Sequence, residues 1–291
     1  MLLSFLLLIR ITANPLSNLF QKRLANSSVN PMFVIFITHL FLTIAFIPLW
    51  IPLLVKSMPI EFYIYLTICS ILSVLANVLI VQALGLGQLS VLGPINSYKS
   101  VVSIFVSVIL IGELPGIYGV IGILLIVLGS HFISEKNENS SSLVSLFKEK
   151  DVQLRIGALI LAATEAVFLK KTLVFANPFL TMSAWSAAGL IFAFIGLLVL
   201  SNGNSKELKN SFISNKWYFV VLFFSTGLMQ LTTLLIFDKM NVSYALALFQ
   251  ISTLISVWMG YKFFAEKNIR RKLIGSLVMI IGAVLIILFN D

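Results

Sequence analysis

The segment Ser90–Glu113, SVLGPINSYKSVVSIFVSVILIGE, carries one lysine, Lys99, near the middle of a largely apolar stretch. It is long enough to cross a bilayer, which takes about 20 apolar residues in a helix. Asn96 and Ser103 lie three and four residues from Lys99, which places all three on one helical face. An ammonium group in contact with lipid is costly, so we expect this face to meet other helices or a water-filled cavity.

The composition predicts an integral membrane protein. Of 291 residues, 59% are hydrophobic and 11% are charged, and the mean hydropathy of +1.04 lies outside the range of ordinary soluble domains. The net charge of +9 comes from lysines and arginines in short polar segments, where they set membrane orientation, so no nucleic acid partner is expected. With Cys69 as its single cysteine, the sequence excludes a disulfide framework, and we expect neither a metal nor another cofactor.

Ten apolar stretches separated by polar breaks predict ten helices that cross the membrane. Five precede and five follow a long hydrophilic segment, Ser134–Arg155, which contains the polar run NENSSS. We therefore predict an all-α membrane protein with a five-helix unit over residues 1–134, a polar linker over 135–155 and a second five-helix unit over 156–291. The predicted crossing helices are Leu2–Phe20, Met32–Val55, Ile60–Leu84, Ser90–Glu113, Pro115–Ile133, Ile156–Phe175, Phe179–Leu200, Trp217–Phe237, Val242–Phe264 and Leu273–Phe289.

The two units repeat one another at a constant offset of 153 residues. Ser90 corresponds to Ser243 and Glu113 to Glu266. The same offset relates Asn77 to Gln230, Ser103 to Ser256, Gly122 to Gly275 and Gly129 to Gly282. Because five helices is an odd number, the second unit enters the membrane from the side opposite to the first. The pattern predicts an inverted repeat around a central cavity, an architecture typical of secondary transporters with a site near the midplane.

These residues resemble a known family. The turn Gly112-Glu113 and the spaced glycines of the helix after it are similar to the EamA repeat of the drug/metabolite transporter superfamily, and Ala265-Glu266 begins a similar pattern in the second unit. The spaced glycines are Gly119, Gly122 and Gly129, then Gly275 and Gly282, and we expect them to pack helices closely in lipid. The resemblance implies ten helices in two fused repeats and transport of a small metabolite. One difference is that Asn14-Pro15 and Thr164-Glu165 replace the aromatic-Gly pattern of the family's first helix.

Three ionisable side chains lie deep in predicted crossing helices: Arg10, Lys99 and Glu165. Each such charge near the bilayer centre costs about 2.5–3.5 kcal/mol on insertion scales, so each needs a partner or water. One interpretation is structural: Lys99 pairs with Glu165 across the two units, and the Arg10 side chain extends to the membrane surface. The other is functional: Lys99 binds an anionic group of the solute, and Glu165 couples transport to a proton or another cation.

Amide, hydroxyl and aromatic side chains of the predicted helices extend this set. We predict a solute site formed by Lys99 together with Asn14, Asn77, Asn96, Tyr98, Ser103, Trp185, Gln230 and Gln250. For any single amide, an interhelical hydrogen bond is the alternative role.

The favoured function is a secondary transporter, working as an exporter of a small polar or anionic metabolite in the plasma membrane. A channel or a non-transporting membrane subunit is the alternative, although no filter motif is visible. An enzyme acting on lipid head groups is less favoured, because the 11 acidic residues show no DxxD or HExxH spacing and the only histidines are His39 and His131.

Two lines of reasoning give opposite orientations. Alternate connections between the predicted helices carry fourteen basic residues on one side, starting with Lys22 and Arg23, and four on the other. The positive-inside rule then places the first side in the cytoplasm and both chain ends outside. The family resemblance implies that both ends are cytoplasmic.

Overall fold

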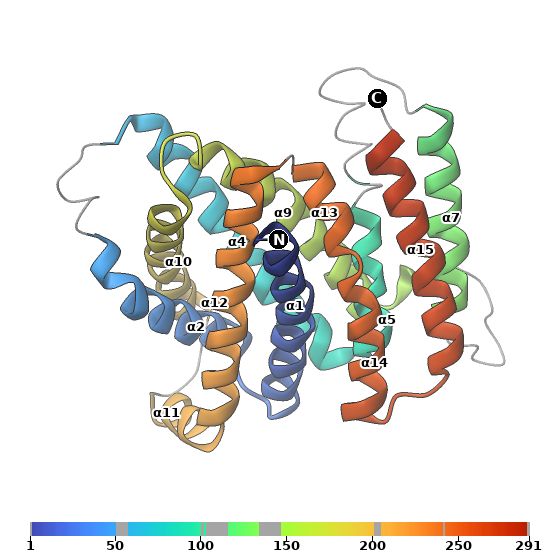
Figure 1. Ribbon diagram of the computed structural model, residues 1–291. Coiled ribbons are helices and arrows are strands. Elements are labelled where there is room, and N and C mark those ends of the chain that lie inside the picture. Colours follow the sequence, from blue (N-terminus) through green and yellow to red (C-terminus); the bar gives the residue numbers. More distant parts are fainter. Residues whose placement is uncertain are drawn as a thin grey trace.

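A computed structural model describes residues 2–50, 58–99, 102, 116–133, 147–200, 205–240 and 242–289 (Figure 1). Within these ranges every regular element is a helix. The first half contains α1 (Leu2–Asn26), α2 (Pro31–Phe46), η1 (Ile47–Trp50), α4 (Ile60–Leu86), α5 (Leu89–Leu92), η2 (Pro94–Ser97) and α7 (Ile117–Ile133). The second half contains α9 (Lys150–Thr172), α10 (Pro178–Leu200), α11 (Ser205–Ser214), α12 (Lys216–Lys239), α13 (Val242–Phe249), α14 (Ser252–Phe264) and α15 (Ile269–Phe289).

Six described helices are long and apolar enough to cross a membrane: α1, α2 with its extension to Leu49, α4, α9, α10 and α12. Ile117–Gly129 forms a shorter apolar helix. Large apolar side chains such as Leu124, Ile191 and Leu198 are more than half exposed, a surface that suits lipid and not water. The all-helical membrane class is therefore confirmed, while ten crossing helices stay a prediction because parts of the predicted spans lie outside the described residues.

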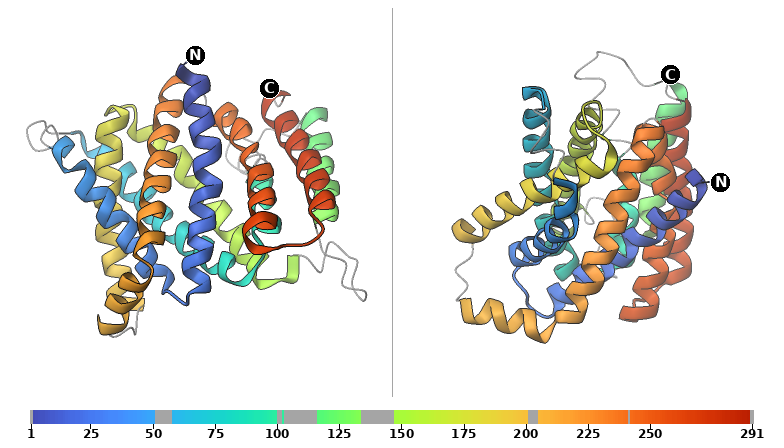
Figure 2. Two further views of the ribbon diagram at one scale, coloured as in Figure 1. Left: turned by 60° about the horizontal axis from the view of Figure 1, so that its bottom comes forward. Right: turned by 60° about the vertical axis from the view of Figure 1, so that its left-hand side comes forward.

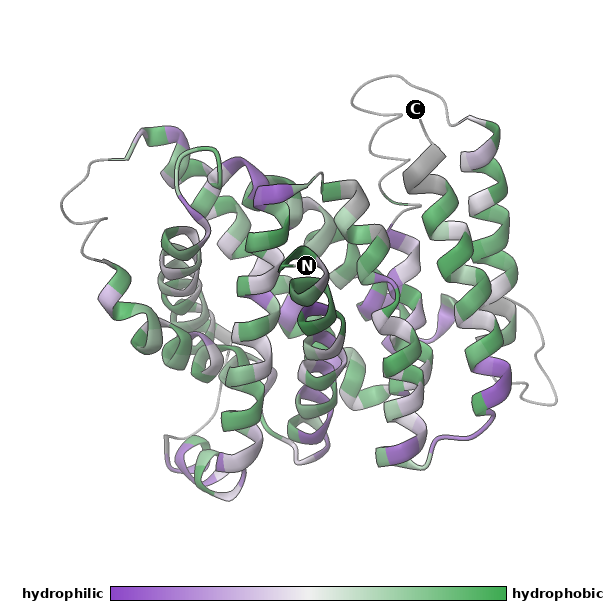
Figure 3. Cartoon of the chain, in the orientation of Figure 1, coloured by the Kyte–Doolittle hydropathy of each residue, from purple (hydrophilic) through white to green (hydrophobic). Residues whose placement is uncertain are grey.

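Apolar residues cover the outer helices, whereas hydrophilic residues gather at α11 and at the connection between α14 and α15 (Figure 3). The α11 sequence SKELKNSFIS has its polar and apolar residues on different faces. Phe212 of this helix packs against Phe41 and Phe219, which holds α11 against α2 and α12. This arrangement is expected for a helix that lies at a membrane surface.

The long helices pack in pairs that join the two halves of the chain. The main pairs are α1 with α12, α4 with α9, α2 with α10 and α7 with α15. The α2–α10 pair and the α7–α15 pair lie at opposite edges of the molecule, with the other pairs between them (Figures 1 and 2). The middle of the fold is therefore built from α1, α4, α9 and α12, two helices from each half.

The glycines of α7 and α15 allow these helices to touch, as their spacing predicts. A Cβ atom on Gly129 would lie 2.7 Å from the backbone oxygen of Gly275, and one on Gly282 would lie 2.6 Å from that of Gly122. Both distances are too short for a side chain. Backbone contact of this kind is a common way for helices to associate where lipid weakens the hydrophobic drive.

The segment that starts at Ser90 is not one regular helix. α5 ends at Leu92, Gly93 forms a turn, and Pro94 begins the 3-10 turn η2. Proline lacks the N–H needed to continue an α-helix, which explains the break and corrects the prediction of a continuous helix from Ser90. Most of the segment beyond Lys99, including Ser103, lies outside the described residues.

Two further predicted elements differ from the structure. The predicted helix Val242–Phe264 is divided into α13 and α14 by a turn at Gln250, whose carbonyl accepts a 2.9 Å hydrogen bond from Thr253 N. In addition, α9 begins at Lys150, so its first turns occupy the end of the predicted linker. This earlier start brings Arg155 into the helix.

Candidate functional site

A cavity of about 140 Å³ lies among the central helices. This volume is large enough for several water molecules or one small solute. Side chains from both halves of the chain line it. Nine residues predicted for the site or its ion pair are among the lining residues: Arg10, Asn14, Asn77, Asn96, Lys99, Glu165, Trp185, Gln230 and Gln250.

Tyr98 and Ser103 complete the predicted set but are not placed in the cavity. Tyr98 packs edge-on against Phe147, with 5.6 Å between ring centres, so it lies outside the cavity lining and its contact with a solute stays a prediction. Residue 98 lies two positions after Asn96 and one before Lys99, so in a helical turn its side chain points away from the face that those two residues share. Ser103 lies outside the described residues.

Arg10 faces the cavity and does not extend to the membrane surface. Its Nε donates a 2.6 Å hydrogen bond to Thr233 Oγ1, and its guanidinium carbon lies 4.4 Å from the centre of the Phe249 ring. Of its two terminal nitrogens, Nη1 is buried without a hydrogen-bond partner in the described part of the chain. The Thr233 bond and the aromatic face fix the guanidinium, and Nη1 is left available to a ligand.

Lys99 and Glu165 come from different halves and interact electrostatically in the cavity. Ser73 and Trp185 also adjoin the Glu165 carboxylate. Their buried donors, Ser73 Oγ and Trp185 Nε1, make no hydrogen bond of normal geometry among the described residues, although both are placed to donate to Glu165 after a small movement. The two charges therefore influence one another, with neutral donors around the carboxylate, and the ion pair expected from the sequence stays a prediction.

Arg155 is a cavity residue that the sequence analysis placed at the end of the polar linker. Its side chain is only 3% exposed, Nη2 donates to Asn96 Oδ1 at 2.7 Å, and Nε donates to the carbonyl of Leu92 at 3.1 Å. A signal was present in the sequence: Arg155, Ala158, Ala162 and Glu165 recur at three- and four-residue spacing and share one helical face. The early start of α9 was the missing information.

Hydrogen bonds among polar side chains brace the cavity wall. Asn14 Nδ2 donates to Ser252 Oγ at 3.2 Å, which ties α1 to α14. Ser17 and Thr226 share a hydrogen bond of 2.9 Å between α1 and α12. The sequence analysis did not include Ser73, Thr226, Thr233 and Ser252 in the site, and all four line the cavity. Small hydroxyl residues are frequent at helix contacts, so sequence alone did not distinguish these from packing residues.

One comparison with known proteins matches part of the chain to a family. Residues 4–135 match the model of the EamA-like transporter family. This part of the chain belongs to that family. Proteins of the EamA-like family are generally membrane transporters of small molecules.

A similarity to a solved structure covers nearly the whole chain. A solved structure, described only as the crystal structure of a protein, matches 99% of this chain and 98% of its own with a TM-score of 0.65 and 14% identity. At this identity the match shows a shared fold and nothing about the solute. No curated protein matches the chain.

His39 supports the cavity wall but does not line the cavity. It is buried between α2 and α10, where Nδ1 donates to the carbonyl of Ser186 at 3.2 Å and the ring lies 4.7 Å from that of Trp185. A Cβ atom on Gly189 would lie 2.2 Å from His39 Cε1, so only glycine fits there. His39 thus positions Trp185 without lining the cavity itself.

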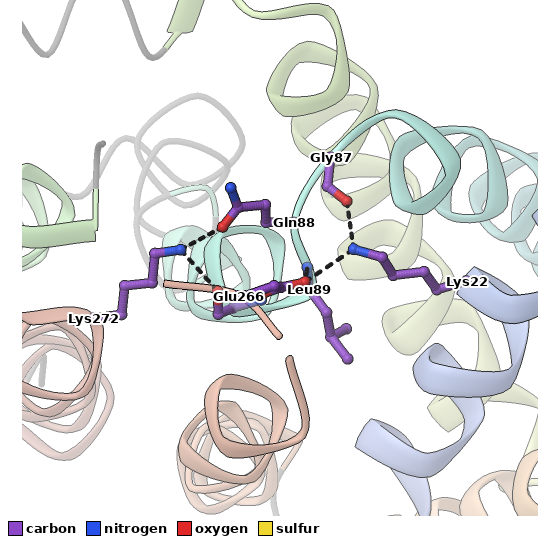
Figure 4. A network of polar contacts seen from close by, with 7 residues as sticks. Lys22, Gly87, Gln88, Leu89, Glu266 and Lys272 are labelled. Carbon is purple, nitrogen blue, oxygen red and sulfur yellow. Dashed lines mark hydrogen bonds and ion pairs between the residues drawn. The ribbon is translucent and has the colours of Figure 1, made fainter. Parts of the chain in front are cut away.

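One end of the fold is closed by a polar network around the start of α5 (Figure 4). Glu266 accepts hydrogen bonds of 2.8 Å from the backbone N–H groups of Leu89 and Ser90 and an ion pair of 3.0 Å from Lys22. Lys22 also donates to the carbonyl of Gly87 at 2.8 Å. Lys272 donates to Gln88 Oε1 and, at 3.0 Å, to Ser90 Oγ. The second half therefore binds the first directly at this end.

Burial of Glu266 by itself would raise its pKa, but the Lys22 charge and the hydrogen bonds from Ser90 and Lys22 outweigh it and hold the pKa below its usual value. The carboxylate is therefore ionised at neutral pH. An ionised group at the N-terminus of a short helix satisfies backbone donors that would otherwise have no partner.

Proposed function

We propose that the protein is a secondary transporter that exports a small polar or anionic metabolite by alternating access. The observation that carries the proposal is the central cavity, to which each half contributes charged and amide side chains. Arg10 and Lys99 come from the first half, and Glu165 and Gln230 from the second. A site formed between two halves changes its access when the halves rock against one another.

The helix pairs support an inverted repeat. In an inverted repeat, α1 would correspond to α9, α2 to α10, α4 to α12 and α7 to α15. Replacing each helix by its counterpart then converts the α1–α12 pair into the α9–α4 pair, and both pairs are present. The same exchange leaves the α2–α10 and α7–α15 pairs unchanged. Contacts at the helix ends follow the same relation: Lys22 donates to the carbonyl of Gly87 after α4, and Lys170 donates to that of Phe237 in α12.

We further propose that the network around Lys22 and Glu266 faces the cytoplasm of a plasma membrane protein. The basic residues of α11 and of the α14–α15 connection belong to this end, which supports the assignment by the positive-inside rule. Both chain ends lie at the other end (Figure 2). The competing arrangement, expected from the family resemblance, has these chain ends in the cytoplasm.

Labelling of introduced cysteines distinguishes the two orientations. Lys209 of α11 and Lys239 at the end of α12 are both exposed, whereas the native Cys69 is buried. In intact cells, a membrane-impermeant thiol reagent should modify the Lys239→Cys variant, and should modify the Lys209→Cys variant only after permeabilisation. The reverse pattern would contradict the proposed orientation.

Reconstitution tests transport itself. Proteoliposomes loaded with an unlabelled solute should accumulate the labelled solute from outside by counterflow, without electrical conductance beyond that of empty liposomes. Single-channel currents would favour a channel, and chemical conversion of a lipid would favour an enzyme. In cells, lower internal levels of the transported solute on expression support export, and higher levels contradict it.

A further inference from the structure

The ionisable groups of the cavity are strongly unbalanced in charge. Arg10, Lys99 and Arg155 line it, and Glu165 is the only acidic lining residue within the described ranges. Arg155 is already engaged, because it donates to Asn96 and to the Leu92 carbonyl. One carboxylate therefore faces three cations in the cavity.

Unpartnered polar groups in the cavity show the same bias. Arg10 Nη1 and Gln230 Nε2 are buried donors without a hydrogen bond of normal geometry in the described part of the chain, while Ser73 Oγ and Trp185 Nε1 adjoin the Glu165 carboxylate and Gln250 Oε1 is an acceptor without a donor there. Gln230 is 7% exposed and Trp185 is 2% exposed. Buried donors are normally satisfied, so this set calls for a ligand that is rich in acceptor oxygens.

α12 places two of these donors next to one another. Thr233 of α12 accepts the Arg10 Nε–H, and Gln230 lies one turn earlier on the same helical face. The Phe249 ring holds the other side of the guanidinium. The free edge of Arg10 and the Gln230 amide thus adjoin, and a planar guanidinium edge beside an amide donor suits a carboxylate or a phosphate.

We propose that the solute is a small organic anion whose carboxylate or phosphate binds between Arg10 and Gln230, and that the cavity changes sides only with an anion bound. This inference rests on the proposed transport function. Closing the empty cavity would remove two excess positive charges from water, which is unfavourable in a low-dielectric interior. A bound anion compensates these charges. The step that returns the cavity to the first side of the membrane therefore also needs a bound anion, so the protein works as an anion exchanger.

Binding by purified protein is the first test, with succinate and glycerol 3-phosphate as anionic probes and glycerol and putrescine as neutral and cationic ones. At least one anion should raise the melting temperature, and the neutral and cationic probes should not. Arg10→Gln should weaken anion binding at least about tenfold, because it removes a charge-assisted hydrogen bond. Arg23→Gln is the matched control: it makes the same change on the same helix, at a guanidinium that packs over Phe20 and Tyr218 away from the cavity.

Arg10→Lys separates a binding defect from a folding defect. If Arg10→Gln lowers the yield of folded protein, the lysine variant should fold and bind anions more weakly than the wild type, because the charge remains without the planar edge. Unchanged anion affinity in a folded Arg10 variant would overturn the proposal. Which of the two anions binds more tightly distinguishes a carboxylate from a phosphate ligand.

Exchange is tested in proteoliposomes loaded with the anion that binds. Efflux should be at least about tenfold faster with an anion outside than with an impermeant buffer outside, because the empty cavity reorients slowly. Equal efflux in both conditions, or flux of only neutral or cationic solutes, would overturn the inference and leave the transporter proposal intact. Absence of carrier-mediated flux for solutes of all charge classes would instead contradict the proposed function.

Discussion

Lys22 and Glu266 form a buried ion pair between residues 244 positions apart in the chain, with 3.0 Å between Nζ and Oε1. Their side chains are 8% and 5% exposed. The pair connects the end of α1 to the turn before α15, and the same carboxylate holds the start of α5. This one contact therefore joins three segments from both halves at the end that we place in the cytoplasm.

Removing the carboxylate should destabilise the protein. Glu266→Ala leaves the Lys22 ammonium buried without its counter-ion, and such losses typically cost about 3–5 kcal/mol. We expect a clear drop in melting temperature in detergent. Glu207→Ala removes an acidic residue from the exposed surface of α11 and should change the melting temperature little. Equal stability of the two variants would show that the ion pair contributes little to the fold.

Acid should weaken the same contact. Because the folded-state pKa of Glu266 is lowered, its contribution to stability is fully present above the unfolded-state value of about 4.5 and is lost as pH falls through the folded-state pKa. The difference in melting temperature between wild type and Glu266→Gln should therefore shrink below about pH 4.5. A difference that stays constant from pH 7 to pH 3 would contradict the lowered pKa.

Lys99 should be needed for transport and not for membrane insertion. Lys99→Ala removes one of the cavity cations and should reduce counterflow at least about tenfold, the usual effect of losing a charge-assisted contact. Lys171→Ala removes a cation that packs over Tyr65 and Phe168 outside the cavity, and serves as the control. Normal flux of the Lys99 variant at equal expression would remove this lysine from the site.

Glu165 is the candidate coupling group. If its carboxylate carries a proton during transport, Glu165→Gln should retain solute binding and lose the pH dependence of flux, because the amide cannot titrate. Glu61→Gln changes an exposed glutamate in the first turn of α4 and should keep the wild-type pH profile. A Glu165→Gln profile that matches wild type would exclude this carboxylate as the proton carrier.

The α7–α15 contact should tolerate no added side chain at Gly129. A Cβ atom there would lie 2.7 Å from a backbone oxygen, so the helices must separate to accept Gly129→Ala. Overpacking of this kind usually costs about 1–3 kcal/mol, which thermal unfolding in detergent can measure. Gly116→Ala, at a site with no atom within 4 Å of the added Cβ, should leave the melting temperature within error.

Local chemistry made much of the candidate site predictable. A charge or an amide inside an apolar helix is costly wherever its partners are, so Arg10, Lys99, Glu165 and Gln230 could be selected without knowing the fold. The membrane class and the glycine contacts of α7 and α15 were predictable for the same reason, because hydropathy and residue size act over a few neighbouring positions.

Only the tertiary structure decided which groups meet. Arg155 has the sequence context of a surface cation, and its place in the cavity depends on where α9 begins and on Asn96 in the other half. Tyr98 packs against Phe147 and lies outside the cavity lining, and Lys22 pairs with Glu266 across almost the whole chain. The sequence by itself determined which side chains need a polar environment, since that need is a property of each residue, while the folded chain alone assigned their partners, since those come from helices that are distant in sequence.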